Sequence, residues 1–169
     1  MCKLSLNQNL TINLEDTSLP SSTTFNELIE MMAEKLYPKQ ISLKDLPQSS
    51  FEVVKGSAEY QPLRLYRNYQ QPGTSTYRVF IQTSDYIDLT DFNALSVAYT
   101  GSSINTQGGA SGISVFLINK GGTSVNAGNP TNGSSVSLAN YSGEYKIRIE
   151  SVSPTRFSVL TFTELLLAE

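Results

Sequence analysis

In several short stretches after residue 41, the apolar residues of this chain recur at every second position, and this pattern limits the possible folds more than any other feature. In EYKIRIES (144–151), apolar residues alternate with charged ones, so a strand here would have one buried apolar face and one solvent-exposed charged face. Further strand candidates lie at 63–68, 76–82, 94–100, 112–119 and 156–165. Short strands separated by polar turns, without intervening helices, predict an antiparallel β-sandwich or jelly roll.

Residues 1–50 predict a small N-terminal segment that contains a strand within 3–14 and one amphipathic helix. Thr24 and Glu27 form a Thr-x-x-Glu capping box at the start of a helix over 24–37. The apolar stripe of this helix consists of Phe25, Leu28, Ile29, Met32 and Leu36. We therefore expect a mainly β chain with an attachment or oligomerisation segment at 1–50 and a β-sandwich domain at 51–169.

The last strand candidate breaks the alternation, because RFSVLTFTELLL would place apolar groups on both faces of a regular strand. Such a strand is predicted to be covered twice, by its own core and by a second surface. That surface is either the N-terminal helix or a neighbouring subunit, since large exposed apolar side chains favour aggregation. The subunit alternative predicts an interface that contains Phe25, Leu28, Met32, Leu160 and Phe162.

Charge and composition exclude several classes of partner. A net charge of −3 gives no broad attraction for phosphate backbones, so nucleic acid is not expected as a partner. No apolar run is long enough to span a bilayer, so no membrane insertion is expected. The lone Cys2 excludes an intrachain disulfide and a metal site built from several cysteines. The start of the chain does not resemble a secretory signal, which predicts synthesis in the cytoplasm.

The chain contains no histidine, which removes the commonest general base and the commonest ligand of transition metals. A Ser-His-Asp or Cys-His centre is therefore excluded. Glycoside hydrolysis by two carboxylates stays open in principle, but the sequence singles out no pair. We expect a protein that is not an enzyme and that has no cofactor apart from a metal ion at the aspartates described next.

Three aspartates, Asp85, Asp88 and Asp91, occur within seven residues of the stretch SDYIDLTDF. Their oxygens predict a calcium site, because calcium binds carboxylate and carbonyl oxygens. The spacing differs from that of an EF-hand loop, and in a regular strand Asp88 would face away from the other two. The alternative is that all three side chains solvate the end of a strand.

Tyrosines crowd the stretch EYQPLRLYRNYQQPGTSTY (59–77), together with asparagine, glutamine and arginine. Tyrosine rings stack on sugar rings, and the amide and guanidinium groups bind hydroxyls, so this composition is typical of glycan sites and also of protein interfaces. The glycan interpretation selects Tyr66, Arg67, Tyr69, Gln71 and Tyr77. Two alternatives stay open: ordinary tyrosines with buried rings, and a contact between subunits.

The second half of the chain resembles a known pattern of core and turn residues. YIDLTDFNALSVAYTGSS is followed by GISVFLIN, SLANYSGEYKIRIESVS and FSVLTFTELLL, in that order. The positions that carry the resemblance are Asp88, Leu89, Thr90, Phe92, Leu95, Val97, Leu138, Tyr141, Ser142, Gly143, Tyr145, Ile147 and Ile149. The pattern covers roughly 76–169 and is similar to a jelly-roll, galactose-binding-like module of phage tail and virion-surface proteins.

This resemblance implies a non-enzymatic structural protein of a phage virion, of the tail-fibre, baseplate, head-fibre or decoration type. It would be made in the host cytoplasm, join other virion proteins and form a homo-oligomer, with a trimer favoured. Its polar loops, chiefly 101–111 and 120–135, would present adaptable surfaces to the host, including a host-surface glycan. The alternative is a stand-alone carbohydrate-binding module that uses Tyr66, Tyr69 and Tyr77.

Overall fold

The computed structural model describes residues 39–102, 112–153 and 158–169, all of which lie in one compact unit, Pro38–Glu169. The helix predicted over 24–37, with Phe25, Leu28 and Met32, falls in a separate unit, Met1–Tyr37, and lies outside the described residues.

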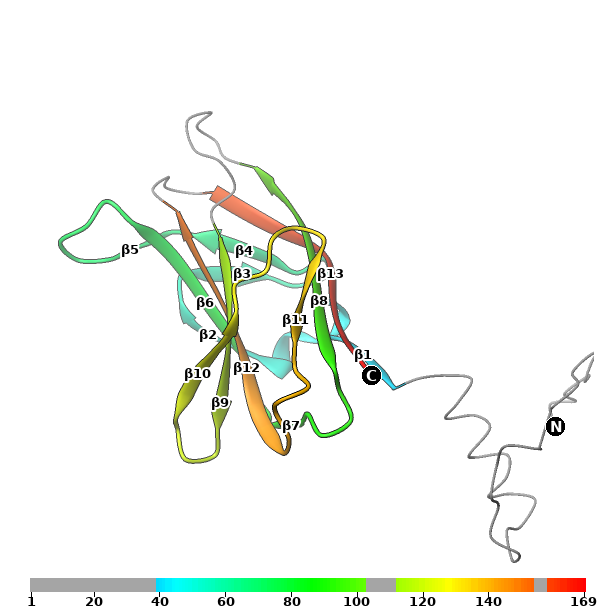
Figure 1. The fold of residues 1–169 in the computed structure, drawn as a ribbon. Helices are drawn as coiled ribbons and strands as arrows, with labels where there is room; N and C mark the ends of the chain where they lie inside the picture. The colour runs from blue at the N-terminus through cyan, green and yellow to red at the C-terminus, as the bar shows by residue number, and fades with distance from the viewer. Residues whose placement is uncertain (1–38, 103–111, 154–157) are drawn as a thin grey trace, which may run out of the picture. The chain divides into compact units, whose positions relative to one another are not determined.

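The described chain forms two antiparallel sheets that face each other across a shared core (Figure 1). Their strands are β1 (Gln40–Ser42), β2 (Phe51–Lys55), β3 (Ser57–Glu59), β4 (Arg64–Arg67), β5 (Tyr69–Gln70), β6 (Tyr77–Thr83), β7 (Ile87–Asp88), β8 (Ala94–Ser102), β9 (Ile113–Asn119), β10 (Ser124–Gly128), β11 (Ser134–Ser137), β12 (Glu144–Ser153) and β13 (Ser158–Ala168). Two short 3-10 helices, η2 (Leu43–Asp45) and η3 (Gln48–Ser50), lie between β1 and β2. The predicted fold class, an antiparallel β-sandwich, is confirmed. No helix in the described ranges has the length and apolar composition needed to cross a membrane.

The longest strands lie in the middle of the two sheets. The six-stranded sheet has the order β11-β8-β13-β4-β3, with β1 also paired to β13. The seven-stranded sheet has the order β10-β9-β12-β6-β2, with β5 paired to β6 and β7 paired to β12. Strands that are distant in the sequence therefore become neighbours, and β12 and β13 carry much of the apolar core.

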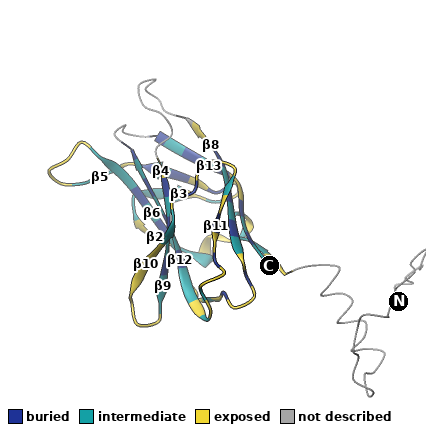
Figure 2. Ribbon diagram, in the orientation of Figure 1, coloured by how far each residue is buried: buried dark blue, intermediate teal, exposed yellow. Residues whose placement is uncertain are grey.

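Alternation along these strands builds the core. In β12, Ile147 and Ile149 are 2% and 3% exposed, and in β9 the side chains of Val115 and Leu117 are fully buried. Figure 2 shows the same alternation as buried and intermediate bands along the strands. Because burial of one such aliphatic side chain stabilises a fold by about 1.5–3 kcal/mol, this face holds the sandwich together, and the opposite face of each strand is free to carry other residues.

The last strand, β13, contains a β-bulge that explains its unusual sequence. Phe162 lies opposite Tyr99, but the next paired residue is Glu164, opposite Ala98, so Thr163 is an additional residue. The buried residues of β13 are even-numbered before the bulge and odd-numbered after it: Ser158, Leu160, Phe162, Leu165 and Leu167. The strand therefore presents one continuous apolar face to the core, although a regular strand with the same sequence would not.

This arrangement corrects the subunit interface that the sequence predicted at Leu160 and Phe162. The two side chains are 0% and 2% exposed within the single chain, and the Phe162 ring packs edge-on against Tyr99 with a centroid separation of 6.3 Å. Side chains buried this deeply in their own core are out of reach of a second subunit. The chain itself supplies the cover that the sequence analysis assigned to the N-terminal helix or to a neighbour.

Two other boundaries also differ from expectation. Residues 40–50, which the sequence analysis placed in the N-terminal segment, belong to the sandwich, because β1 pairs with β13 and Leu43 is 1% exposed in the core. The stretch 120–135, predicted as a loop, contains β10, which forms an antiparallel hairpin with β9. A turn closes this hairpin, in which the amide of Asn119 donates to the carbonyl of Thr123.

Candidate functional site

The face of the seven-stranded sheet that points away from the core is the candidate site. Along β6, β9 and β12, half-buried residues alternate with the buried ones and point to this face; they are Arg78, Phe80, Gln82, Ser114, Phe116, Ile118, Lys146, Arg148, Glu150 and Val152. The register of the adjoining strands adds Glu52, Lys55, Tyr69, Ser124 and Asn126. We call this set the outer face.

Strand pairing aligns the outer face in rows that run across the sheet. The first row consists of Asn126, Phe116, Arg148, Gln82 and Glu52. The second row consists of Ser114, Glu150, Phe80 and Lys55, and the third of Val152, Arg78 and Tyr69. Successive rows lie about 7 Å apart along the strands. Aromatic, cationic and polar groups are therefore interleaved both along and across the sheet.

In the middle of the outer face, two guanidinium groups lie over two phenylalanine rings. The Cζ atom of Arg148 is 5.7 Å from the ring centroid of Phe116, and that of Arg78 is 5.8 Å from the ring centroid of Phe80. Both distances are within the range of a cation–π interaction. Each of these two arginine side chains therefore lies against an aromatic ring of the same face.

The two ends of the outer face repeat this pairing with lysine and tyrosine. At one end, the Lys55 Nζ atom is 4.5 Å from the ring centroid of Tyr69. At the other end, the Nζ atoms of Lys146 and Lys120 are 5.6 Å and 5.9 Å from the ring centroid of Tyr86. Tyr86 is 36% exposed and therefore offers an accessible ring. Aromatic rings thus extend from one end of the face to the other.

Hydrogen bonds and ion pairs order the polar groups between the rings. The Gln82 amide donates to the Glu52 carboxylate at 2.8 Å, and Lys146 lies 3.9 Å from the same carboxylate. Arg148 pairs with Glu150 at 3.4 Å, and both side chains are largely shielded, with 21% and 15% exposed. Because these groups already hold one another in place, the binding of a ligand would cost little side-chain entropy of the protein.

Glu150 lies among the cations of the outer face. Burial raises the pKa of its carboxyl group, while the charges of Arg148 and Arg78 act in the opposite direction. The buried Nε atoms of Arg78 and Arg148 have no hydrogen-bond partner among the described residues.

The five residues that the sequence analysis assigned to a glycan site do not come together. Tyr69 lies on the outer face, but Tyr66 lies on the opposite side of the sandwich, on the outward side of the six-stranded sheet. Arg67 is buried between the sheets, where burial lowers the pKa of its guanidinium to about 10. Tyr77 points to the core side, and Gln71 lies in the turn between β5 and β6. Tyr69 is thus the one member of the set on the outer face.

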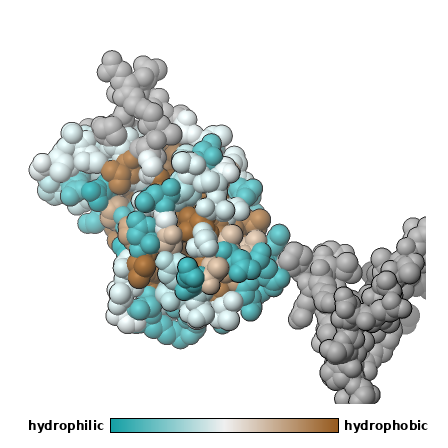
Figure 3. Space-filling view, viewed as in Figure 1, coloured by the Kyte–Doolittle hydropathy of each residue, from teal (hydrophilic) through white to brown (hydrophobic). Residues whose placement is uncertain are grey.

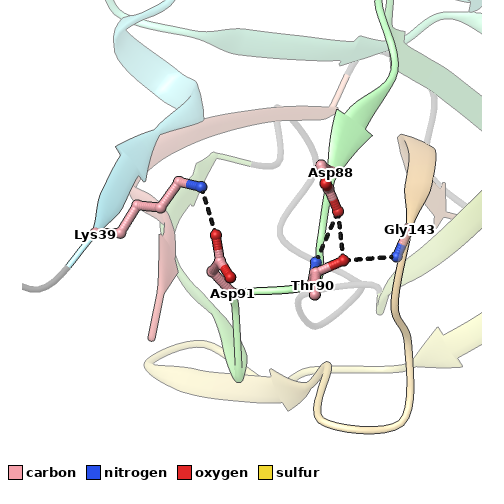
Figure 4. Close-up of polar contacts among 5 residues, drawn as sticks. All are labelled: Lys39, Asp88, Thr90, Asp91 and Gly143. Carbon is pink, nitrogen blue, oxygen red and sulfur yellow. Dashed lines mark hydrogen bonds and ion pairs between the residues drawn. The ribbon is translucent and has the colours of Figure 1, made fainter.

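The three aspartates are also separated by their contacts. Asp91 forms an ion pair with Lys39 at 2.8 Å, and Asp88 accepts hydrogen bonds from the backbone and the hydroxyl of Thr90 at 3.0 Å and 2.6 Å (Figure 4). The Asp85 side chain is exposed. The part of the chain that the structure describes holds no group of three or more acidic, cysteine or histidine side chains arranged for a metal ion. The described structure therefore does not bring the three carboxylates together into the predicted calcium site.

Asp88 and Thr90 instead join two segments of the motif noted in the sequence. The Thr90 hydroxyl accepts a hydrogen bond from the amide of Gly143 at 3.0 Å, and the amide of Leu89 donates to the carbonyl of Gly143 at 2.9 Å (Figure 4). Gly143 has a φ of +90°, a conformation that glycine adopts most readily. The motif therefore ties the segment after β7 to the turn before β12, which is a structural role.

We expect the substitution Thr90→Val to lower the melting temperature by a few degrees, because it removes the two hydrogen bonds that the Thr90 hydroxyl forms at this junction, with Asp88 and with Gly143. Thr90→Ser keeps the hydroxyl and serves as the control. The hydrogen bonds from Thr90 hold the pKa of Asp88 below its usual value, so their contribution is present above about pH 4 and is lost as the pH falls further. Melting curves recorded from pH 7 to pH 2.5 should therefore show that the difference in melting temperature between Thr90→Val and Thr90→Ser becomes smaller in acid. A difference that stays constant with pH would contradict this account.

Sequence analysis missed most of the outer face. Phe80, Phe116, Arg78, Arg148 and Glu150 come from three strands that are distant in the sequence. The sequence did contain one indication of this site: the outward positions of these strands carry arginine and phenylalanine where serine and threonine would be more usual. Only the strand order and register bring these residues together.

No protein-family model matches the chain, and no curated protein matches it significantly. Among solved structures, it is similar to an agarase, with a TM-score of 0.46 and 12% identity over 77% of this chain and 24% of the agarase, so the chain spans about a quarter of that protein. It is also similar to a carbohydrate-binding module that recognises mannan, with a TM-score of 0.44 and 11% identity over 78% of this chain and 96% of the module. At these identities and TM-scores, neither likeness identifies a ligand for this chain.

Proposed function

We propose that the chain is a non-catalytic carbohydrate-binding module whose outer face holds the glycan. The observation that carries this proposal is the interleaving of aromatic rings with fixed hydrogen-bonding groups over the length of β12. The outer-face residues of β12, from Lys146 to Val152, span about 20 Å, which is long enough for several sugar units.

The chemistry of a sugar matches this surface. A pyranose ring has an apolar C–H face, which packs on aromatic rings such as those of Tyr86 and Tyr69, and a rim of hydroxyls that both donate and accept hydrogen bonds. Gln82, Glu150 and Arg148 provide donors and acceptors between the rings. An extended glycan lying along β12 would therefore meet an aromatic ring at each end and polar groups in the middle.

Other partners fit less well. The cores of protein interfaces are depleted of charged residues, whereas the outer face carries six, namely Glu52, Lys55, Arg78, Lys146, Arg148 and Glu150. In the view of Figure 3, apolar residues form separate small patches among polar ones, without one continuous patch. A chain with a net charge of −3 also lacks the long-range attraction that nucleic acids require.

The expected place of the module on a phage virion, with other virion proteins, itself and host glycans as partners, stays a prediction. It is compatible with a glycan-binding face, because repeated copies on a particle would strengthen weak single contacts. Capsid or tail genes beside the gene for this chain would support it, whereas a polysaccharide-degradation locus would favour a module of an enzyme system.

The experiment that tests the function is affinity electrophoresis against a panel of soluble neutral and acidic polysaccharides, followed by calorimetry with any that retards the protein. We expect Tyr86→Ala and Tyr69→Ala each to lower the affinity about tenfold, because each removes a ring at one end of the outer face.

Tyr66→Ala is the matched control, since Tyr66 lies on the other sheet and should leave binding unchanged. Thermal melting of each variant shows whether the fold is retained. A protein that binds none of the polysaccharides, or that loses binding equally with Tyr66→Ala, would contradict the proposed function.

A further inference from the structure

The charges of the outer face are unevenly paired. It carries four cations, Lys55, Arg78, Lys146 and Arg148, and two carboxylates. The carboxylate of Glu52 is held by Gln82 and lies near Lys146, and that of Glu150 is paired with Arg148. The ion pairs of both carboxylates are therefore formed with Lys146 and Arg148, and the other two cations, Arg78 and Lys55, form none within the described part of the chain, although the charge of Arg78 acts on Glu150 over a longer distance.

Arg78 and Lys55 lie where β2, β5 and β6 meet. Arg78 lies directly opposite Tyr69, and Lys55 lies opposite Phe80, one row away on the same face. Among the described residues, neither Arg78 nor Lys55 has a carboxylate within ion-pairing distance; Lys55 contacts the ring and, at 3.5 Å, the hydroxyl of Tyr69. Two cations thus flank one aromatic ring on a chain whose overall charge is negative.

From this juxtaposition, and resting on the proposed function, we infer that the glycan is acidic and that Arg78 and Lys55 hold its anionic group beside the ring of Tyr69. A carboxylate of a uronic acid and a sulfate ester share the chemistry that this subsite recognises. The guanidinium fork of Arg78 binds two oxygens of such a group, and Lys55 adds a point charge. The ring of Tyr69 receives the apolar face of the same sugar unit.

A substitution of Glu150 distinguishes the binding of an acidic glycan from that of a neutral one. Its carboxylate lies within the electrostatic reach of Arg78 and competes with an anionic ligand for that charge. Glu150→Gln should therefore strengthen the binding of an acidic glycan. If the ligand were neutral, Glu150 would act as an acceptor for sugar hydroxyls, and the same substitution would weaken binding.

The test uses polygalacturonate and its fully methyl-esterified form, which share one backbone and differ in charge, together with a sulfated galactan and agarose as a second pair. The full-length chain is examined by calorimetry in low and high salt. We expect binding to the acidic member of at least one pair, at least tenfold weaker binding to its neutral partner, and weakening by salt. A preference for polygalacturonate over its methyl ester would indicate a subsite for a carboxylate, and a preference for the sulfated galactan over agarose would indicate a subsite for a sulfate.

Arg78→Gln and Lys55→Gln should each lower the affinity for the acidic glycan about tenfold or more, and Arg78→Lys should restore part of the loss. Arg64→Gln is the matched control, because Arg64 lies on the outward side of the other sheet and pairs with Glu59 at 3.4 Å. Lys55 lies at the sheet edge, so its variant tests the subsite even if Arg78→Gln lowers the stability of the fold.

Three outcomes would overturn this inference alone, and a fourth would overturn the proposed function with it. Equal binding of charged and neutral partners, or binding of neutral polysaccharides alone, would refute an acidic ligand while leaving the proposed function intact. If Arg78→Gln and Lys55→Gln left the affinity for the acidic glycan unchanged, the anionic group of the ligand would bind elsewhere. If Glu150→Gln bound the acidic glycan more weakly, the Glu150 carboxylate would not be competing with the ligand for Arg78. If no polysaccharide of either kind binds, the proposed function fails together with the inference.

Discussion

Deleting Thr161 is expected to lower the free energy of unfolding by about 3–5 kcal/mol, whereas deleting Thr163, two residues further along β13, is expected to have a much smaller effect. Both deletions remove one residue from the same strand and both remove the bulge. They differ in which side chain remains opposite Tyr99. The contrast therefore tests the bulge and not simply the tolerance of the strand to shortening.

The difference follows from counting positions along the partner strand. Leu160 lies opposite Gly101 and Leu165 lies opposite Val97, so three positions of β8 face the segment between them, which has four residues. Without Thr163, Phe162 keeps its place in the core, and the strand becomes regular. Without Thr161, Phe162 moves to the outward side, and a threonine takes its place in the core.

Chemical denaturation monitored by tyrosine fluorescence measures both free energies. Thr163→Ala is a further control, because an exposed side chain is replaced without any change in register, and its effect should lie within about 0.5 kcal/mol. Equal destabilisation by the two deletions would show that the strand re-registers by a different route, and the assignment of Thr163 as the additional residue would have to be given up.

The fold class was predictable because the central strands alternate cleanly. The predicted strands at 94–100, 112–119 and 144–151 correspond to β8, β9 and β12 within a few residues. Most of their core positions carry large apolar side chains, whereas their outward positions mix polar, charged and apolar ones, so one face must be buried wherever the strand lies. The burial of one face of such a strand follows without knowledge of its neighbouring strands.

The edge strands were not predictable in the same way. β10 lies at one edge of its sheet, and Val125, which is opposite the fully buried Leu117, is itself 41% exposed. β2, at the other edge, leaves Val53 and Val54 at 38% and 40% exposed. A strand that is only partly covered places little demand on its side chains, so its sequence resembles that of a loop.

The bulge in β13 was also beyond local pattern analysis. The three consecutive leucines at 165–167 fit either register, and a single inserted residue leaves no composition signal. The pattern was therefore interpreted as a strand with two apolar faces, and a second subunit was invoked to cover one of them. The pairing with β8 supplies the missing information, since it shows where two residues of one strand oppose one position of the other.

The site was least predictable because side chains share a face through register and not through proximity in the sequence. Tyr66 and Tyr69 are three residues apart, yet β4 and β5 belong to different sheets and the two rings lie on opposite sides of the molecule. Conversely, Phe116 and Arg148 are 32 positions apart and lie directly opposite each other. A cluster of aromatic residues in the sequence is thus a poor guide to a cluster on a sheet.

The motif that carries the family resemblance has a physical explanation. Thr90 and Gly143 join two connections, and Leu89 is fully buried beside them, so this residue pattern is required by the fold. None of its residues lies on the outer face. A resemblance built on such positions predicts architecture and carries no information on a ligand, which is why it led correctly to the sandwich and named no binding residue.

The second large effect is expected for Leu43→Ala, which should lower the free energy of unfolding by about 2–5 kcal/mol. Leu43 is 1% exposed and belongs to the main hydrophobic core, although it precedes the boundary at residue 50 that the sequence suggested. β1, directly before it, pairs with the end of β13 from Ser42 to Gln40. Residues 39–50 are thus part of the sandwich, and the side chain of Leu43 fills space that only this chain can fill.

Leu46→Ala is the matched control, because Leu46 packs against the same core but is only partly buried and should cost clearly less. Unfolding of the full-length chain by denaturant at several protein concentrations measures both values. If residues 39–50 acted as a docking segment for another subunit, Leu43→Ala would change the concentration dependence of the midpoint and leave the stability of the monomer alone. A loss of stability that is independent of concentration follows from the core position, since the partner of Leu43 is the sandwich that the same chain builds.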